Sequence, residues 1–259
     1  MPSECDEPAF LSGAETVPIP RALVEALLSA RAVAVLTGSG VSAESGVPTF
    51  RDAQTGLWAR YDLADLATRE AFEHDPGLVW EWYEWRRKLV REAVPNAGHL
   101  ALAQLERRVS GFSLITQNVD GLHQRAGSGG VIELHGNITR TKCAVEDVLV
   151  EDYTPESMPP VCPNCGSPLR PDVVWFGETL SADALHAASE VASTCDLFFS
   201  VGTSGLVQPA ASLPFEALRG GATVVEVNSD ETPLTRSADY VLRGRAGEVL
   251  AALVEATYG

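Results

Sequence analysis

Positive charge is scarce in this chain. Nineteen lysine and arginine residues face 35 aspartate and glutamate residues, which gives a formal net charge of −16 at pH 7. Only two of the basic residues are lysines, Lys88 and Lys142. Because proteins bind nucleic acids chiefly by neutralising phosphates with lysine and arginine, we expect no specific nucleic-acid partner.

Long apolar runs are absent as well. No stretch approaches the roughly 20 apolar residues that span a membrane, and the first ten residues, MPSECDEPAF, lack the basic and apolar regions of a secretion signal. We therefore expect no membrane segment and a cytoplasmic location. The five cysteines are an odd number, so they indicate a metal site or free thiols and not a disulfide framework.

Short apolar runs alternate with amphipathic segments along most of the chain. The predicted strands are 33–36, 112–115, 131–134, 173–176, 197–201, 223–227 and 240–242. The predicted helices are 21–30, 99–109, 183–192, 209–219 and 247–256. Such alternation predicts an α/β fold with a doubly wound, Rossmann-like parallel sheet.

Two segments interrupt this alternation. Residues 53–98 are rich in tryptophan and charge and are predicted to be helical, whereas residues 137–172 are rich in proline and carry three of the cysteines. We expect these inserts to form a second, smaller domain. The large domain then consists of residues 20–52, 99–136 and 173–256, and residues 1–19 are an N-terminal extension.

Polar side chains follow two of the predicted strands. Gln117, Asn118 and Asp120 come after the strand at 112–115, and His135 ends the apolar run at 131–134. Ligands of open α/β sheets bind at the carboxyl ends of the strands, and a histidine there can act as a base near neutral pH. These residues therefore predict a catalytic site.

A glycine-rich segment follows the first predicted strand. Residues 37–43 read TGSGVSA, which is G-x-G-x-x-A, a pattern that lets the backbone approach a pyrophosphate at the start of a helix. By itself the pattern could also be a tight turn. An ordinary dinucleotide-dependent dehydrogenase is disfavoured because no acidic residue follows at the usual offset of about 20 residues.

Three cysteines have the spacing of a zinc module. Cys162 and Cys165 form a C-x2-C turn, and Cys143 lies where the first cysteine of a partner turn would stand. The position of the fourth cysteine is occupied by Glu146. Since zinc also accepts carboxylate oxygens, we predict one zinc ion bound by three thiolates and Glu146, or less favourably Asp147; the alternative is a module that has lost zinc.

Six ordered motifs together carry a family resemblance. They are TGSGVSAESGVPTFRD, TQNVDGLH, ELHG, RPDVVWFGE, VGTSGLVQPA and EVN. In this order and spacing they resemble the sirtuins, NAD-dependent protein lysine deacylases, over roughly residues 20–255. One departure is Ser39, where the family usually has alanine between two glycines.

The resemblance implies roles for individual residues. His135 would be the general base, and Asn118 would position the ribose and a water molecule. The expected NAD-binding residues are Gly38, Ser39, Gly40, Ser42, Phe50, Arg51, Gln117, Asn118, Val119, Asp120, Gly202, Thr203, Ser204 and Asn228. The expected substrate-binding residues are Ala67, Tyr83, Arg86, Val174, Phe176 and Gly177. Acyl-lysine proteins or peptides would be the partners, and the zinc would be structural.

Residues 78–92 suggest which acyl group is bound. Tyr83 and Arg86 are three residues apart and so share one helix face, and this Tyr-x-x-Arg resembles the sirtuin subgroup that removes succinyl and malonyl groups. A guanidinium binds a carboxylate through two hydrogen bonds, and Ala67 would leave room for the longer chain. The alternative is a solvated basic helix face above an aromatic core stripe.

Other functions remain open from the sequence. A sirtuin fold could instead transfer ADP-ribose or hydrolyse NAD, or it could bind NAD without catalysis. The set of Asn118, Asp120 and His135 argues against a non-catalytic module, and the pair Tyr83 and Arg86 favours deacylation over ADP-ribosyl transfer.

Overall fold

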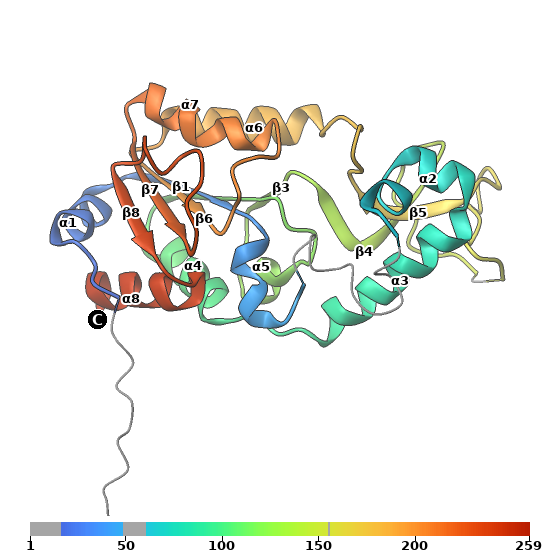
Figure 1. Ribbon diagram of the computed structural model, residues 1–259, viewed down its shortest axis with the longest axis horizontal. Coiled ribbons are helices and arrows are strands. Elements are labelled where there is room, and N and C mark those ends of the chain that lie inside the picture. Colours follow the sequence, from blue (N-terminus) through green and yellow to red (C-terminus); the bar gives the residue numbers. More distant parts are fainter. Residues whose placement is uncertain (1–16, 49–60, 155) are drawn as a thin grey trace, which may run out of the picture.

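A six-stranded parallel sheet forms the centre of the molecule in the computed structural model, which describes residues 17–48, 61–154 and 156–259 (Figure 1). Its strands are β1 (Ala32–Thr37), β2 (Gly111–Thr116), β3 (Val131–Glu133), β6 (Leu197–Val201), β7 (Thr223–Asn228) and β8 (Tyr240–Arg243). The spatial order is β3-β2-β1-β6-β7-β8, and all five strand pairs are parallel. This is the order of a doubly wound Rossmann-like sheet, so the predicted fold class is confirmed.

Helices cover both faces of the sheet because successive strand residues point to opposite sides. On one face lie α1 (Arg21–Ser29), α4 (Ala97–Arg108) and α8 (Ala246–Tyr258), which share a core with Val33 and Val35 of β1. On the other face lie α6 (Ala182–Thr194), the short helix η5 (Ala210–Ser212) and α7 (Leu213–Gly220), which pack on Ala34 and Leu36. Figure 1 shows α6 and α7 above the sheet and α4 and α8 below it.

Capping side chains set the starts of several helices. Asn96 caps α4 by accepting hydrogen bonds from the backbone N–H groups of Gly98 and His99, and the His99 side chain completes a capping box. Thr68 caps α2 (Arg69–His74), and Asp75 caps α3 (Pro76–Glu92). These caps satisfy N–H groups that have no partner within their helix.

The two inserts pack together beside the sheet. Helices α2 and α3 lie against a two-stranded antiparallel sheet of β4 (Gly136–Cys143) and β5 (Leu169–Val173), at the right of Figure 1. Their common core contains Phe72, Trp82, Tyr83 and Trp175, all of them buried. The boundaries of the two predicted domains stay a prediction.

One local prediction was wrong. The strand expected at 173–176 ends at Val173, because the backbone N–H of Val174 turns to the carbonyl of His135 and Phe176 pairs with Thr68 instead. Within the described residues, the glycine-rich segment continues into two 3₁₀ turns, η1 (Ser39–Val41) and η2 (Ala43–Ser45), and Gly46 ends them with a positive φ of 75°.

Two further short helices complete the described elements, α5 (Leu122–Arg125) after β2 and η4 (Leu63–Asp65) before α2. Within the described residues, no helix is both long enough and apolar enough to cross a membrane.

Candidate functional site

The predicted ligand-binding residues meet where the order of the strands reverses, between β1 and β6. Gly38 and Gly40 leave the end of β1 and touch Gly202, which leaves the end of β6: a Cβ on Gly38 or on Gly40 would lie 2.8 Å from Gly202 atoms. The backbone N–H groups of Gly38 and Gly40 donate to the carbonyls of Val201 and Gly202. Only glycine fits this contact, and the resulting cradle is of the kind that takes a pyrophosphate.

Gln117 and Asn118 extend the cradle from the end of β2. The Asn118 Nδ2 group donates to the Gly38 carbonyl at 3.1 Å and to Ser42 Oγ at 3.1 Å. The Gln117 Nε2 group donates to Thr203 Oγ1 at 2.8 Å. Residues almost 90 positions apart in the chain are thereby fixed in one polar surface.

Asp120 lies buried at the inner end of this surface. Its carboxylate accepts hydrogen bonds from Ser42 Oγ at 2.7 Å and from the backbone N–H of Leu122 at 2.9 Å. His99 stands behind Ser42, with Nε2 3.3 Å from Oγ. Since His99 Nδ1 accepts from the backbone N–H of Asn96, the hydrogen of the neutral ring sits on Nε2 and points to Ser42. Two successive hydrogen bonds, from His99 to Ser42 and from Ser42 to Asp120, thus hold the Asp120 carboxylate in place.

His135 stands just after β3 and faces the same surface. Its Nδ1 lies 2.8 Å from the carbonyl oxygen of Gln117. A carbonyl only accepts, so Nδ1 carries the hydrogen and Nε2 keeps its lone pair. Burial lowers the pKa of His135, against the opposing effect of the Gln117 hydrogen bond. The ring is therefore neutral at pH 7 and can accept a proton at Nε2.

The ends of β6 and β7 close the surface on its far side. Asn228 Nδ2 donates to the Thr203 carbonyl at 2.8 Å, which joins the end of β7 to the loop after β6. Thr203 is buried and Ser204 is exposed beside it. We refer to the residues at these five strand ends as the sheet-edge site; they are Gly38, Ser39, Gly40, Ser42, Gln117, Asn118, Val119, Asp120, His135, Gly202, Thr203, Ser204 and Asn228.

The predicted acyl-binding residues lie together in the smaller lobe. Tyr83 is 1% exposed, and its hydroxyl accepts a hydrogen bond from Trp175 Nε1 at 2.9 Å. The backbone N–H of Phe176 donates to the carbonyl of Ala67 at 3.0 Å. The RPDVVWFGE segment therefore contacts both Tyr83 and Ala67, although 92 residues separate Tyr83 from Trp175.

Burial changes the pKa of both Tyr83 and Arg86. Burial raises the pKa of Tyr83, so the phenol stays protonated, and because its oxygen accepts from Trp175, its own hydrogen is available to another acceptor. Arg86 is 8% exposed and lies over the ring of Trp82, 4.9 Å from its centroid. Burial lowers the pKa of Arg86, and Tyr83 and the nearby carboxylate of Asp120 oppose that effect. The guanidinium of Arg86 also lies 5.9 Å from the centroid of the Tyr83 ring, so the two predicted acyl-binding residues are neighbours.

The next residue, Arg87, has a structural role. Its guanidinium donates to the carbonyls of Ile138 and Arg140 at 2.6 and 2.8 Å and pairs with Glu84 at 2.6 Å. These bonds attach α3 to β4. Arg87 thus binds main-chain carbonyls about 50 residues away in the chain, a contact that its position in the sequence does not reveal.

Four donor side chains form a compact cluster at the far end of the smaller lobe. The ligand atoms of Cys143, Glu146, Cys162 and Cys165 all lie within 4.8 Å of one another. The Cys143 and Cys165 sulfurs are 3.5 Å apart, and the Cys162 sulfur is 3.6 Å from a Glu146 oxygen. Two sulfurs on a tetrahedral zinc, each about 2.3 Å from the ion, would be about 3.8 Å apart. We call these four residues the metal cluster; they fit a structural zinc ion.

The structure favours Glu146 over Asp147 as the fourth ligand. Asp147 turns away from the sulfurs, and its carboxylate pairs with Lys142 at 2.7 Å. Asp147 also has a positive φ of 54°, the conformation that brings the chain around this tight turn. The Glu146 carboxylate is left facing the three thiols.

Some functional residues were missed, and others cannot be assessed. His99 received no role from the sequence, although its place three residues after Asn96 fits a capping box and could have marked it. Trp175 was missed although it lies inside a recognised motif. Phe50 and Arg51, which the resemblance assigns to NAD, lie outside the described residues.

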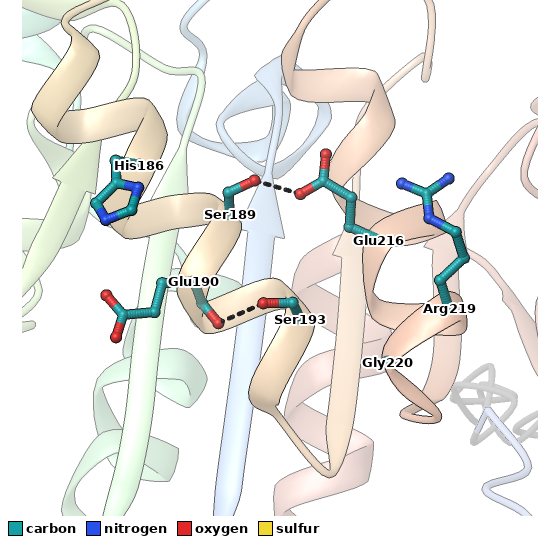
Figure 2. Close-up of a pocket in the computed structure, with 7 residues that line it drawn as sticks. All are labelled: His186, Ser189, Glu190, Ser193, Glu216, Arg219 and Gly220. Atoms are coloured by element: carbon teal, nitrogen blue, oxygen red, sulfur yellow. Dashed lines mark hydrogen bonds between the residues drawn. The ribbon is translucent and has the colours of Figure 1, made fainter.

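A shallow hollow of about 640 Å³ lies elsewhere, between α6 and α7. Figure 2 shows Ser189 bonded to Glu216 and Ser193 bonded to the carbonyl of Glu190, so these polar groups satisfy one another. No residue of the sheet-edge site lines this hollow. We therefore place the chemistry at the strand ends and not here.

Known proteins resemble this chain over most of its length. The model of the Sir2 family matches residues 38–209. NAD-dependent protein deacylase 1 of Pseudomonas aeruginosa is 51% identical over 247 residues, which cover 92% of this chain and 99% of that protein. A Sir2 homologue solved as a complex with NAD superposes with a TM-score of 0.87 at 46% identity, covering 95% of this chain and 96% of the other. A Sir2 structure with a p53 peptide and NAD+ gives 0.81 at 34% identity, covering 91% and 97%.

Proposed function

Because the chain belongs to the Sir2 family and is an NAD-dependent protein deacylase, we propose that it removes succinyl and malonyl groups from lysine side chains in preference to acetyl groups. The observation that carries the proposal is a buried arginine, Arg86, beside a buried tyrosine, Tyr83. Proteins or peptides bearing such acyl-lysines are the proposed substrates.

The chemistry of this pair suits an acyl chain that ends in a carboxylate. Arg86 offers several N–H donors in one plane, and Tyr83 offers a hydroxyl hydrogen. The Arg86 guanidinium lies over the ring of Trp82, and the carboxylate of a bound succinyl group would add charge-assisted hydrogen bonds to it. An acetyl group has no such carboxylate.

Small and apolar residues would leave room for a longer acyl group. Ala67 is 2% exposed and is fixed to Phe176 by a backbone hydrogen bond. Its methyl group takes little room between the helical insert and the RPDVVWFGE segment. Val174, Phe176 and the exposed Gly177 continue this segment as the proposed contact surface for the substrate peptide.

NAD fits the sheet-edge site as described. When bound, NAD would supply the ribose that accepts the acyl group, and nicotinamide would be released as a product. The glycine cradle of Gly38, Gly40 and Gly202 would lie against its pyrophosphate, since a side chain there would fill the space. Asn118 and Gln117 would bind ribose hydroxyls, and Val119 and Asp120 would lie against the nicotinamide carboxamide.

His135 is the proposed base. Its neutral ring presents Nε2 while Gln117 holds Nδ1, so it can take a proton from a ribose hydroxyl without reorienting. Because burial lowers its pKa, the base stays unprotonated to lower pH than a free histidine would. Activity should therefore decline on the acid side below pH 6.5, as His135 becomes protonated.

The test uses three peptides of one sequence that differ only in a succinyl, malonyl or acetyl group on a single lysine. Each is incubated with NAD, and the deacylated peptide and acyl-ADP-ribose are measured by mass spectrometry. We expect a higher kcat/KM for the succinyl or malonyl peptide. A higher value for acetyl would reject the acyl preference, and NAD consumption without deacylation of any peptide would favour NAD hydrolysis or ADP-ribosyl transfer.

We also propose a cytoplasmic location, which rests on the sequence pattern alone. Fractionation of cells that produce the protein would test it.

A further inference from the structure

His135 occupies the junction between the two sheets of the molecule. The residue before it, Leu134, donates its backbone N–H to Thr116 of β2, and the ring bonds to Gln117. Its own carbonyl accepts the backbone N–H of Val174, just beyond β5. The orientation of the ring therefore depends on both the parallel sheet and the two-stranded sheet of β4 and β5.

Arg140 connects the same two parts through its side chain. Its Nη2 group pairs with Glu133 of β3 at 2.6 Å, and its Nε group pairs with Asp172 of β5 at 2.8 Å. Glu133 lies two residues before His135, and Asp172 lies two residues before Val174. The two ion pairs thus flank the backbone hydrogen bond that holds His135.

The contacts around Arg140 are fixed from several sides. Arg87 donates to the carbonyl of Arg140 at 2.8 Å, which attaches its backbone to α3. The other carboxylate oxygen of Glu133 accepts from Gln124 at 2.8 Å and from Asn137 at 2.9 Å. Asp172 faces Gly136 so closely that a Cβ on this glycine would lie 2.2 Å from the Asp172 carbonyl oxygen. The turn that carries His135 is therefore packed directly against β5.

From this geometry we propose that Arg140 is a positioning residue for deacylation: it holds the turn of His135 against β5 so that Nδ1 stays bonded to Gln117 and Nε2 faces the ribose. The inference rests on the proposed role of His135 as the base. Arg140 itself lies outside the sheet-edge site and touches neither Gln117 nor His135 by a hydrogen bond or ion pair seen among the described residues.

The physical effect should be on rate more than on stability. The Arg140 side chain is 41% exposed, so its ion pairs are screened by solvent and contribute little to folding. A base that is misplaced by a fraction of an ångström, in contrast, loses much of its rate advantage. Without Arg140 the turn gains freedom, and the ring can exchange its Gln117 bond for others.

The experiment compares Arg140→Gln with wild type and with Arg21→Gln, which removes an exposed arginine of the pair Arg21–Glu25 on α1. Two quantities are measured: kcat and KM for NAD with an acetyl-lysine peptide, and the tautomer of His135 by ¹⁵N NMR of labelled histidine. The chain has five histidines, and the signals missing from His135→Ala identify those of His135. We expect kcat to fall about tenfold in Arg140→Gln, with KM for NAD nearly unchanged and a mixture of tautomers at His135. Arg21→Gln should match wild type.

Wild-type kcat together with a wild-type His135 tautomer in Arg140→Gln would overturn the proposal, whatever happens to the melting temperature. If Arg140→Gln fails to fold, Glu133→Gln replaces it, because it removes only one of the two ion pairs and keeps an amide oxygen for Gln124 and Asn137. A wild-type tautomer and kcat in Glu133→Gln would likewise reject the inference. Full activity of His135→Ala would instead refute the base assignment, and the NMR result would still report on positioning.

Discussion

The sheet-edge site and the metal cluster are built in opposite ways. At the sheet edge, backbone hydrogen bonds between parallel strands place every functional side chain, and side chains such as Asn118 and Ser42 already bond to one another. In the metal cluster, four donors on two turns face one another, and the buried core around them includes two of the ligands themselves, Cys143 and Cys162. The first region is held by the fold, whereas the second needs an ion to complete its packing.

This comparison separates chemistry from stability. A substitution of a polar side chain at the sheet edge, such as His135, should remove a reaction step and leave the fold intact, because the strands do not depend on that side chain; the close-packed glycines of the cradle are the exception. A substitution in the metal cluster should weaken ion binding and the local fold and affect chemistry only indirectly. Substitutions at His135 and Glu146 test this division directly, and substitutions at Arg86 and His123 sharpen it.

The largest effect should come from His135→Ala. Loss of a positioned base typically costs at least ~10²-fold in rate, so deacylation should fall by that factor while the protein folds normally. Steady-state kinetics and NAD binding by calorimetry measure the two quantities. Wild-type turnover would show that another group acts as the base, and a lower melting temperature would show that this region is less independent of its side chains than we argue.

Arg86→Met should have the next largest effect, on one substrate only. Removing one partner of a desolvated charge pair costs about 2–5 kcal/mol, and about 1.4 kcal/mol is a factor of ten, so desuccinylation should fall roughly 30-fold or more. Deacetylation should not fall in parallel. Lys88→Met, which removes an exposed cation from the same helix, is the matched control and should change neither activity. Equal loss of both activities in Arg86→Met would make Arg86 a structural residue like Arg87.

Glu146→Ala should weaken zinc binding by at least ~10-fold, since even groups outside the ligand set change metal affinity by that much, and Glu146→Cys should strengthen it. We expect about one zinc per chain in wild type prepared without chelator, measured by elemental analysis, with affinities from competition with a chromophoric chelator. Thermal melts should show Glu146→Ala to be the less stable protein. A wild type free of zinc, or equal affinities in all three proteins, would contradict the assignment of the cluster.

The smallest effect should come from the buried histidine His123, which lies beside His99. Burial lowers the pKa of His123 to about 3, helped by the neighbouring His99, whose ring centre is 4.8 Å away. In the unfolded chain His123 titrates near its ordinary value of about 6.5, so the unfolded state binds more protons below that pH, and stability declines as the pH falls. Lowering the pH from 7.5 to 5.5 should therefore reduce the free energy of unfolding by about 1.4 kcal/mol through His123.

His123→Asn removes this titration. The difference in the free energy of unfolding between pH 7.5 and 5.5, measured with urea, should be smaller in the variant by about 1.4 kcal/mol. The carboxylates titrate equally in both proteins and cancel in the comparison. The same pH dependence in both proteins would mean that His123 is protonated within the fold.

Much of the molecule follows from local sequence patterns. The apolar runs at 33–36, 112–115 and 197–201 lie within β1, β2 and β6, because buried parallel strands need continuous apolar segments. The polar residues that follow these strands lie at one edge because parallel strands bring their carboxyl ends together. The cysteine spacing likewise gave the metal cluster, since two short turns suffice to bring the ligands together.

Other features depend on contacts between distant segments, which no local pattern contains. Three such contacts arise when the helical insert, the two-stranded sheet and the strand ends pack together. They are the hydrogen bond between Trp175 and Tyr83, the hydrogen bond of Phe176 to Ala67, and the contact of His99 with Ser42. The end of β5 at Val173 was mispredicted because apolar character continues to Phe176 while the hydrogen bonds turn to other segments. The sequence by itself thus determined which residues could do chemistry. Only the packing of segments decided which contacts they make: Arg87, one position after Arg86, attaches α3 to β4 through main-chain carbonyls that come from a distant part of the sequence.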